Sequence, residues 1–140
     1  MQKDTMYDRL YNDYTATRHE WEQALDDLGK ALTTLADVRR SHAETTDAIN
    51  IFEYSALAAE THKEGQINGS NAEKRKTQTV LLLASMADTN AEYKALLTAD
   101  DDSRRRIDEL EIEIESLKGK ISFLRNMARM NAGLAHALVG

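Results

Sequence analysis

The chain has 140 residues, a formal net charge of −6, no proline, no cysteine and 30% charged residues. The lack of cysteine excludes disulfides, thiolate zinc sites and a cysteine nucleophile. The acidic balance disfavours binding to a phosphate backbone unless a local basic patch supplies the attraction. A proline-free composition rich in charged helix formers is typical of long helices.

From Tyr7 to Ala56, large residues recur at every seventh position and form a column. Further apolar residues lie three or four positions after many of them, so that the two sets together form one apolar face of a helix. This periodicity predicts a first helical arm over about residues 4–62, as one helix or as two nearly continuous ones. The column consists of Tyr7, Tyr14, Trp21, Leu28, Leu35, His42, Ile49 and Ala56.

A polar loop follows at about residues 63–69, within HKEGQINGSNAEKRK. Gly65 and Gly69 bracket this loop. Ser70 with Glu73 has the spacing of a capping box, in which the two side chains satisfy free amides at the start of a helix. The second arm is therefore predicted to run over about residues 70–138.

The second arm keeps one heptad register from Leu82 to Leu138, and residues 107–124 alternate isoleucine and leucine in its apolar seam. This alternation is typical of a coiled coil and favours a parallel dimer where the seam pairs with a second chain. Asp100 and Ser103 interrupt the seam and predict a polar joint at 98–106. Replacing both with leucine is expected to raise thermal stability while loosening the register.

Two arms of similar length joined by a short loop predict a single all-α domain over residues 1–140, folded as a long antiparallel helical hairpin or coiled coil. A turn centred near residue 69 places Leu28 opposite Leu110 and brings Arg39 within reach of Asp100. The alternative is a break near residue 100, with the last helix folding back into a three-helix bundle.

The stretch TADDDSRRRIDEL at 98–110 invites a metal-site hypothesis, which its geometry does not support. Adjacent helical residues point about 100° apart, and the ligand spacing of a calcium loop is absent. Acids four positions before arginines stabilise a helix by roughly 0.2–0.5 kcal/mol per pair instead. The histidines lack zinc spacing and no catalytic motif occurs. We expect no enzymatic activity, metal, cofactor or small-molecule substrate.

Association with another protein is the remaining expectation for the surface. Tyrosine and tryptophan dominate interface hot spots, although a heptad column of them is more often core. Apolar residues left over on the second arm should also seek a partner. The candidate interaction residues are Tyr7, Tyr14, Trp21, Arg104, Arg105, Arg106, Phe123, Met127 and Met130.

The segments EGQINGSNAEKRKTQ and DDDSRRRIDELEIEIESLKGKISFLRNMARM resemble the small all-helical early proteins of bacteriophages and prophages. In those proteins a G-x-N-x-x-x-R-K turn commonly starts the second arm, and here it is Gly69, Asn71, Arg75 and Lys76. The resemblance covers about residues 65–130. It implies an accessory protein that acts on host machinery or on phage recombination, including inhibitors of host defence, and it identifies no active residues.

We therefore expect a non-enzymatic coiled-coil module that binds a host protein complex, such as a phage-encoded inhibitor, or binds itself. The longest apolar run, VLLLA at 80–84, is far shorter than the roughly 20 residues of a membrane span, and the amino terminus lacks an apolar signal region. A cytoplasmic protein without membrane contact is expected. One alternative is a structural homo-oligomer. The other is a nucleic-acid recombination accessory protein that uses Arg39, Arg40, Lys74, Arg75, Lys76 and Arg104 to Arg106.

Overall fold

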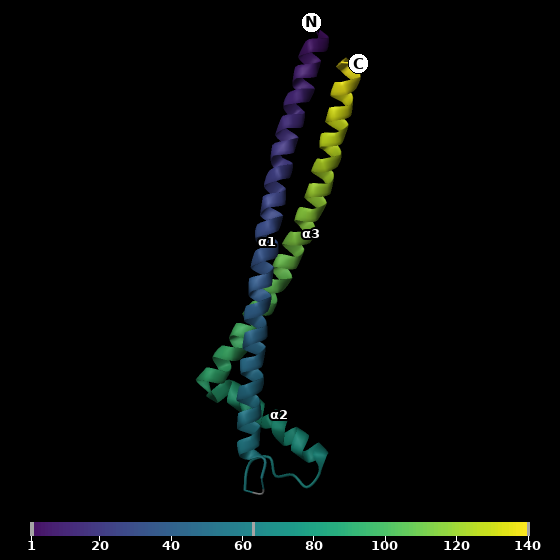
Figure 1. The fold of residues 1–140 in the computed structure, drawn as a ribbon. Coiled ribbons are helices and arrows are strands. Elements are labelled where there is room, and N and C mark those ends of the chain that lie inside the picture. Colours follow the sequence, from purple (N-terminus) through teal and green to yellow (C-terminus); the bar gives the residue numbers. More distant parts are fainter. Residues whose placement is uncertain (1, 63, 140) are drawn as a thin grey trace. The chain divides into compact units, whose positions relative to one another are not determined.

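The computed structural model describes residues 2–62 and 64–139 and contains three helices (Figure 1). They are α1 (Gln2–Glu60), α2 (Ala72–Thr89) and α3 (Ala91–Val139). Helices hold 92% of the described residues, which include no strand, and α1 packs closely against α3. The predicted all-α class is confirmed, and the first arm is one uninterrupted helix.

The chain forms two compact units. Unit 1 consists of Met1–Ala36 and Asp108–Gly140, and unit 2 consists of Asp37–Ile107. In unit 1 the start of α1 lies beside the end of α3, since Tyr7 and Tyr14 line the same surface hollow as Ala132 and His136. The two helices of this unit are therefore antiparallel, as the hairpin interpretation predicts.

The core of unit 1 is a narrow seam between α1 and α3. Leu110 is its most buried large side chain, with 1% of its surface exposed. Small residues on α1, such as Ala24 and Ala31, are also buried, and their short side chains allow the two helix backbones to approach closely. The predicted seam of α3 is confirmed, because every predicted seam position from Leu110 to Leu138 is buried or half-buried.

Unit 2 contains the end of α1, the whole of α2 and the start of α3. The predicted second arm is therefore two helices, which meet at Asn90. Asn90 has an extended backbone (φ −99°, ψ 112°), and its N–H donates to the Met86 carbonyl to close α2. Its side-chain oxygen accepts the Tyr93 N–H at 3.0 Å and so caps the start of α3. The chain changes direction between α2 and α3 (Figure 1).

The expected break near residue 100 is wrong in position. Residues 98–106 lie inside the uninterrupted helix α3, about three turns after Asn90. Aspartates followed by arginines four positions later are compatible with a continuous helix. Asn90, by contrast, offers the side chain that caps a new one.

In unit 2 the predicted register between the two arms is also wrong. A turn centred near residue 69 places Tyr93 opposite Thr45, yet its hydroxyl contacts Glu53, about two turns further along α1. The reason is the segment between Glu60 and Ala91, which holds a separate helix and a structured loop. It is not a tight turn whose centre fixes the pairing.

Residues 64–71 of the loop between α1 and α2 are held by contacts with the two helices that the loop joins. Amides of Asn68 and Gly69 donate to Gln78 Oε1 at 2.9 and 2.7 Å, and the buried Ile67 donates its N–H to the Glu60 carbonyl. The N-cap of α2 is Asn71, whose side chain accepts the Lys74 N–H at 2.8 Å. The predicted cap at Ser70 is therefore one residue too early.

Gly65 is a required glycine of this loop. A Cβ at this position would overlap the Glu60 carbonyl, whereas a Cβ at Gly29, in the middle of α1, would meet nothing within 4 Å. We expect Gly65→Ala to lower the free energy of unfolding by about 1–3 kcal/mol through overpacking. The control Gly29→Ala is expected to raise it by about 0.5–1 kcal/mol through helix propensity. Urea unfolding followed by circular dichroism measures both, and equal effects would contradict the loop geometry.

Candidate functional site

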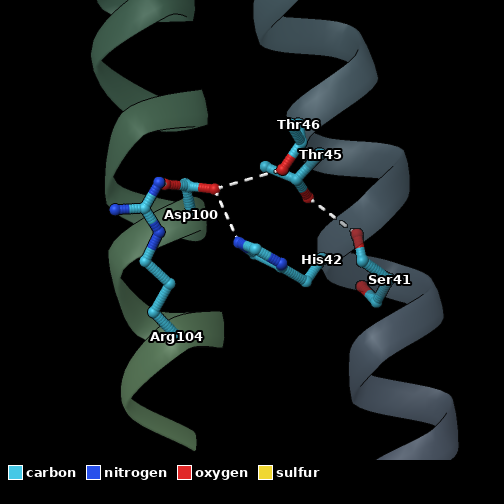
Figure 2. Close-up of polar contacts among 6 residues, drawn as sticks. All are labelled: Ser41, His42, Thr45, Thr46, Asp100 and Arg104. Carbon is cyan, nitrogen blue, oxygen red and sulfur yellow. Dashed lines mark hydrogen bonds and ion pairs between the residues drawn. The ribbon is translucent and has the colours of Figure 1, made fainter. Parts of the chain in front are cut away.

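Asp100 is a buried carboxylate at the centre of a polar cluster in unit 2 (Figure 2). Its Oδ1 lies 2.9 Å from His42 Nε2 and accepts the Thr46 hydroxyl at 3.5 Å, both from α1. Its Oδ2 lies 3.0 Å from Arg104 Nη2, one turn on in α3. Both carboxylate oxygens are thus occupied by protein partners, and the cluster fixes where α3 meets α1 in this unit.

The contact with His42 is a close approach without the alignment of a hydrogen bond. Nε2 is shielded from solvent and has no aligned acceptor among the described residues, although Asp100 is near. His42 forms an ion pair with the carboxylate only when its imidazole is protonated. The sequence predicts that Arg39 comes within reach of Asp100. The observed neighbour His42 lies about one turn further along α1.

A second cluster of unit 2 lies one to two turns further along α1. The Tyr93 hydroxyl donates to Glu53 Oε1 at 2.6 Å, and its ring stacks on Phe52 with centroids 5.3 Å apart and planes 6° apart. Burial of the hydroxyl and its bond to the Glu53 carboxylate together raise the pKa of Tyr93 to about 12. This residue joins α1 to the first turn of α3.

The raised pKa of Tyr93 predicts a loss of stability at high pH. The neutral hydroxyl is favoured when folded, while an unfolded tyrosine ionises near pH 10. Stability from this group is therefore complete below about pH 10 and is lost as pH rises from about 10 to 12. We expect tyrosinate absorbance to show a late step near pH 12 that the Tyr93→Phe variant lacks. Identical titration curves for the two proteins would contradict the contact.

The predicted basic candidates are occupied within the chain to a large extent. Arg104 pairs with Asp100, and Arg106 also makes an interaction of its own. Arg105 is exposed on the solvent side of α3. Arg75 donates to the Gly69 carbonyl at 3.2 Å and so helps to close the loop. These contacts give Arg75, Arg104 and Arg106 structural roles in unit 2.

The predicted aromatic candidates differ in their surroundings, since Tyr7 and Tyr14 line a surface hollow and Trp21 does not. Tyr7 and Tyr14 line one open hollow of about 390 Å³ at the end of unit 1. Its other lining residues are Tyr11, Ala132, Ala135 and His136. Tyr7 stacks on Tyr11, with ring centroids 6.4 Å apart, and Tyr11 has 56% of its surface exposed. We call Tyr7, Tyr11 and Tyr14 the tyrosine cluster.

Trp21 does not belong to this surface. Its ring is half-buried in unit 1, and its indole N–H is shielded from solvent without an acceptor among the described residues. The heptad column is therefore half-buried at Trp21 and exposed at Tyr7. Along this column Leu35 is buried, Leu28, Trp21 and Tyr14 are half-buried, and Tyr7, near the start of α1, is exposed.

The remaining candidates lie on α3 in unit 1. Phe123 and Met130 are exposed and Met127 is half-buried, and their spacing of four and three residues places them on one side of the helix. The isoleucine and leucine seam, by contrast, is buried against α1. It is therefore not available for the parallel dimer that its alternation suggests.

Sequence reasoning missed the exposure of Tyr11 and the capping role of Asn90. Tyr11 lies four residues after Tyr7, which favours assigning it to the same buried stripe, and only the packing shows that it faces outward. Asn90 had a readable signal, because asparagine before Ala-Glu is a preferred N-cap sequence. The seam also weakens there, since Thr89 is its exposed member.

No cluster of three or more histidine, aspartate or glutamate side chains in residues 2–62 and 64–139 is arranged to hold a metal ion. Within the same part of the chain, no helix is both long and apolar enough to cross a membrane.

The fold and these surfaces define an all-helical protein with exposed apolar residues on a two-helix unit. Comparison with protein-family models, with curated proteins and with solved structures found no match to this chain.

Proposed function

We propose that the protein is a non-enzymatic helical module that binds another protein through the tyrosine cluster of unit 1. The observation that carries the proposal is the balance of apolar residues in this unit. Its buried large apolar side chains are Leu35, Leu110, Ile114 and Leu124, whereas its exposed ones are Met6, Tyr7, Tyr11, Leu25, Leu32, Ile112, Phe123, Met130 and Leu134.

The tyrosine cluster has the chemistry of a binding surface. Tyrosine offers a large rigid ring together with a hydroxyl, which is the combination favoured at interface hot spots. The hollow beside it is also lined by Ala132, Ala135 and His136 and by no carboxylate, lysine or arginine, so an apolar side chain of a partner can pack against it. The resemblance to phage accessory proteins extends this proposal to a host protein as the partner.

The test compares two tyrosines of the same chain in a pull-down from cells that produce the protein. Tyr11 belongs to the tyrosine cluster, whereas Tyr54 lies in unit 2 and has 77% of its surface exposed. We expect Tyr11→Ala to lose a bound protein that the wild type and Tyr54→Ala retain, with a loss of affinity of at least about tenfold. Retention by all three proteins would contradict the proposal.

A further inference from the structure

The outer face of α3 in unit 1 is a second surface, distinct from the tyrosine cluster. Its residues recur at helical spacing and all are exposed, with Ile112 at 71% and Phe123 at 63%. We define the outer face as Ile112, Ser116, Gly119, Phe123 and Met130. Large apolar groups at both ends flank small residues in the middle, where a Cβ at Gly119 would meet nothing within 4 Å.

The charges beside this face are divided along the helix. Residues 108–115 hold five acids and no base, while residues 116–129 hold four bases and no acid. Asp108 and Arg129 flank the outer face on one side, and Glu113 and Lys120 flank it on the other. All four are exposed and none of them has an ion-pair partner among the described residues.

We propose that the outer face of α3 binds the same face of a second copy, with the two helices antiparallel. A two-fold axis midway between Ile112 and Phe123 places Ile112 against Phe123 of the second copy, and Ser116 against its Gly119. A two-fold contact of this kind requires a self-complementary surface. The small residues at the centre let the helices cross closely, and the large ones pack on either side.

The same two-fold axis also brings opposite charges of the two copies together. Asp108 falls beside Arg129 of the second copy, and Glu113 falls beside its Lys120, each within about 3 Å along the helix axis at 1.5 Å per residue. A parallel pair would instead place the two acidic segments side by side, where like charges repel. The division of charge thus favours a second copy and selects the antiparallel direction.

The decisive experiment is a charge exchange followed by sedimentation velocity at low salt. We expect the 15.8 kDa chain to reach about twice that mass with rising concentration. Glu113→Lys or Lys120→Glu alone should weaken the dimer about tenfold, since each contact occurs twice. The double variant should restore it, and Glu44→Lys on α1 of unit 2 is the matched control.

The direction of the pair is measured separately with spin labels, because the chain has no cysteine of its own. Labels at Ser116→Cys should lie within about 20 Å of each other, whereas labels at Ala137→Cys should lie about 60 Å apart. Short distances at both positions would overturn the antiparallel arrangement. A monomer at every concentration, or a double variant that fails to recover, would overturn the dimer contact while leaving the Tyr11 test of the proposed function intact.

Discussion

Leu110→Ala is expected to lower the free energy of unfolding of unit 1 by about 3 kcal/mol. Leu110 is the one large side chain among the described residues that is fully buried. A two-helix seam surrounds it with few neighbours that can move in to fill the cavity. Urea unfolding followed by circular dichroism, with hydrogen exchange to locate the loss in unit 1, measures the effect.

Ile112→Ala is the matched control for this substitution. Ile112 lies two positions away on α3, but 71% of its surface is exposed, so its truncation should change the free energy of unfolding by no more than about 0.5 kcal/mol. The measurement belongs at low protein concentration, where the proposed dimer is dissociated. Comparable losses for the two variants would mean that α3 presents a different face to α1.

Asp100→Leu is expected to lower the free energy of unfolding of unit 2 by about 1–2 kcal/mol. The substitution leaves the buried Nε2 of His42 and the Thr46 hydroxyl beside an apolar group. Arg104 contributes little to the loss, because its side chain is 66% exposed and can pair with water. The sequence alone predicts the opposite sign for apolar substitution here, since it does not show these two partners.

The double variant Asp100→Leu with His42→Leu tests why Asp100→Leu is destabilising. It distinguishes the loss of the polar contacts from a general intolerance of any substitution at this position. An apolar pair at the same place satisfies the requirement for burial, so its unfolding free energy should return to the wild-type value or exceed it. Thermal unfolding of the wild type and the two variants gives the comparison. A double variant as unstable as the sum of its single changes would argue against the observed contact.

The helical class and the inward face of α3 were predictable from the sequence. A seven-residue repeat reports which side of a helix is buried, whichever helix covers it. For this reason the predicted seam from Leu110 to Leu138 is correct, and α1 is the helix that packs against it in unit 1. The repeat carries no information about the identity of the covering helix.

The helix boundaries and the register were less predictable, because they depend on single side chains. Asn90 ends α2 and starts α3 within a sequence that continues the heptad register without a glycine or proline. Asn71 takes the cap from Ser70 because its side chain reaches the Lys74 amide. The register follows from contacts such as Tyr93 with Glu53, which join residues 40 positions apart.

The sequence indicates which kinds of residue are available for binding, but only partly which of them are exposed. Heptad counting identifies Phe123 and Met130 as apolar residues outside the seam, and both are exposed. It cannot separate Trp21 from Tyr7, because both occupy the same column. Their different exposure reflects how closely the two helices pack at each level.

The most direct test of the proposed protein-binding role is photo-crosslinking from the tyrosine cluster. A benzophenone side chain replaces Tyr11 in one protein and Tyr54 in another, and each is irradiated in the cells that produce it. We predict an adduct with a different protein from position 11 and none from position 54. Equal adducts from the two positions, or none from position 11, would contradict the assignment of the tyrosine cluster as the binding surface.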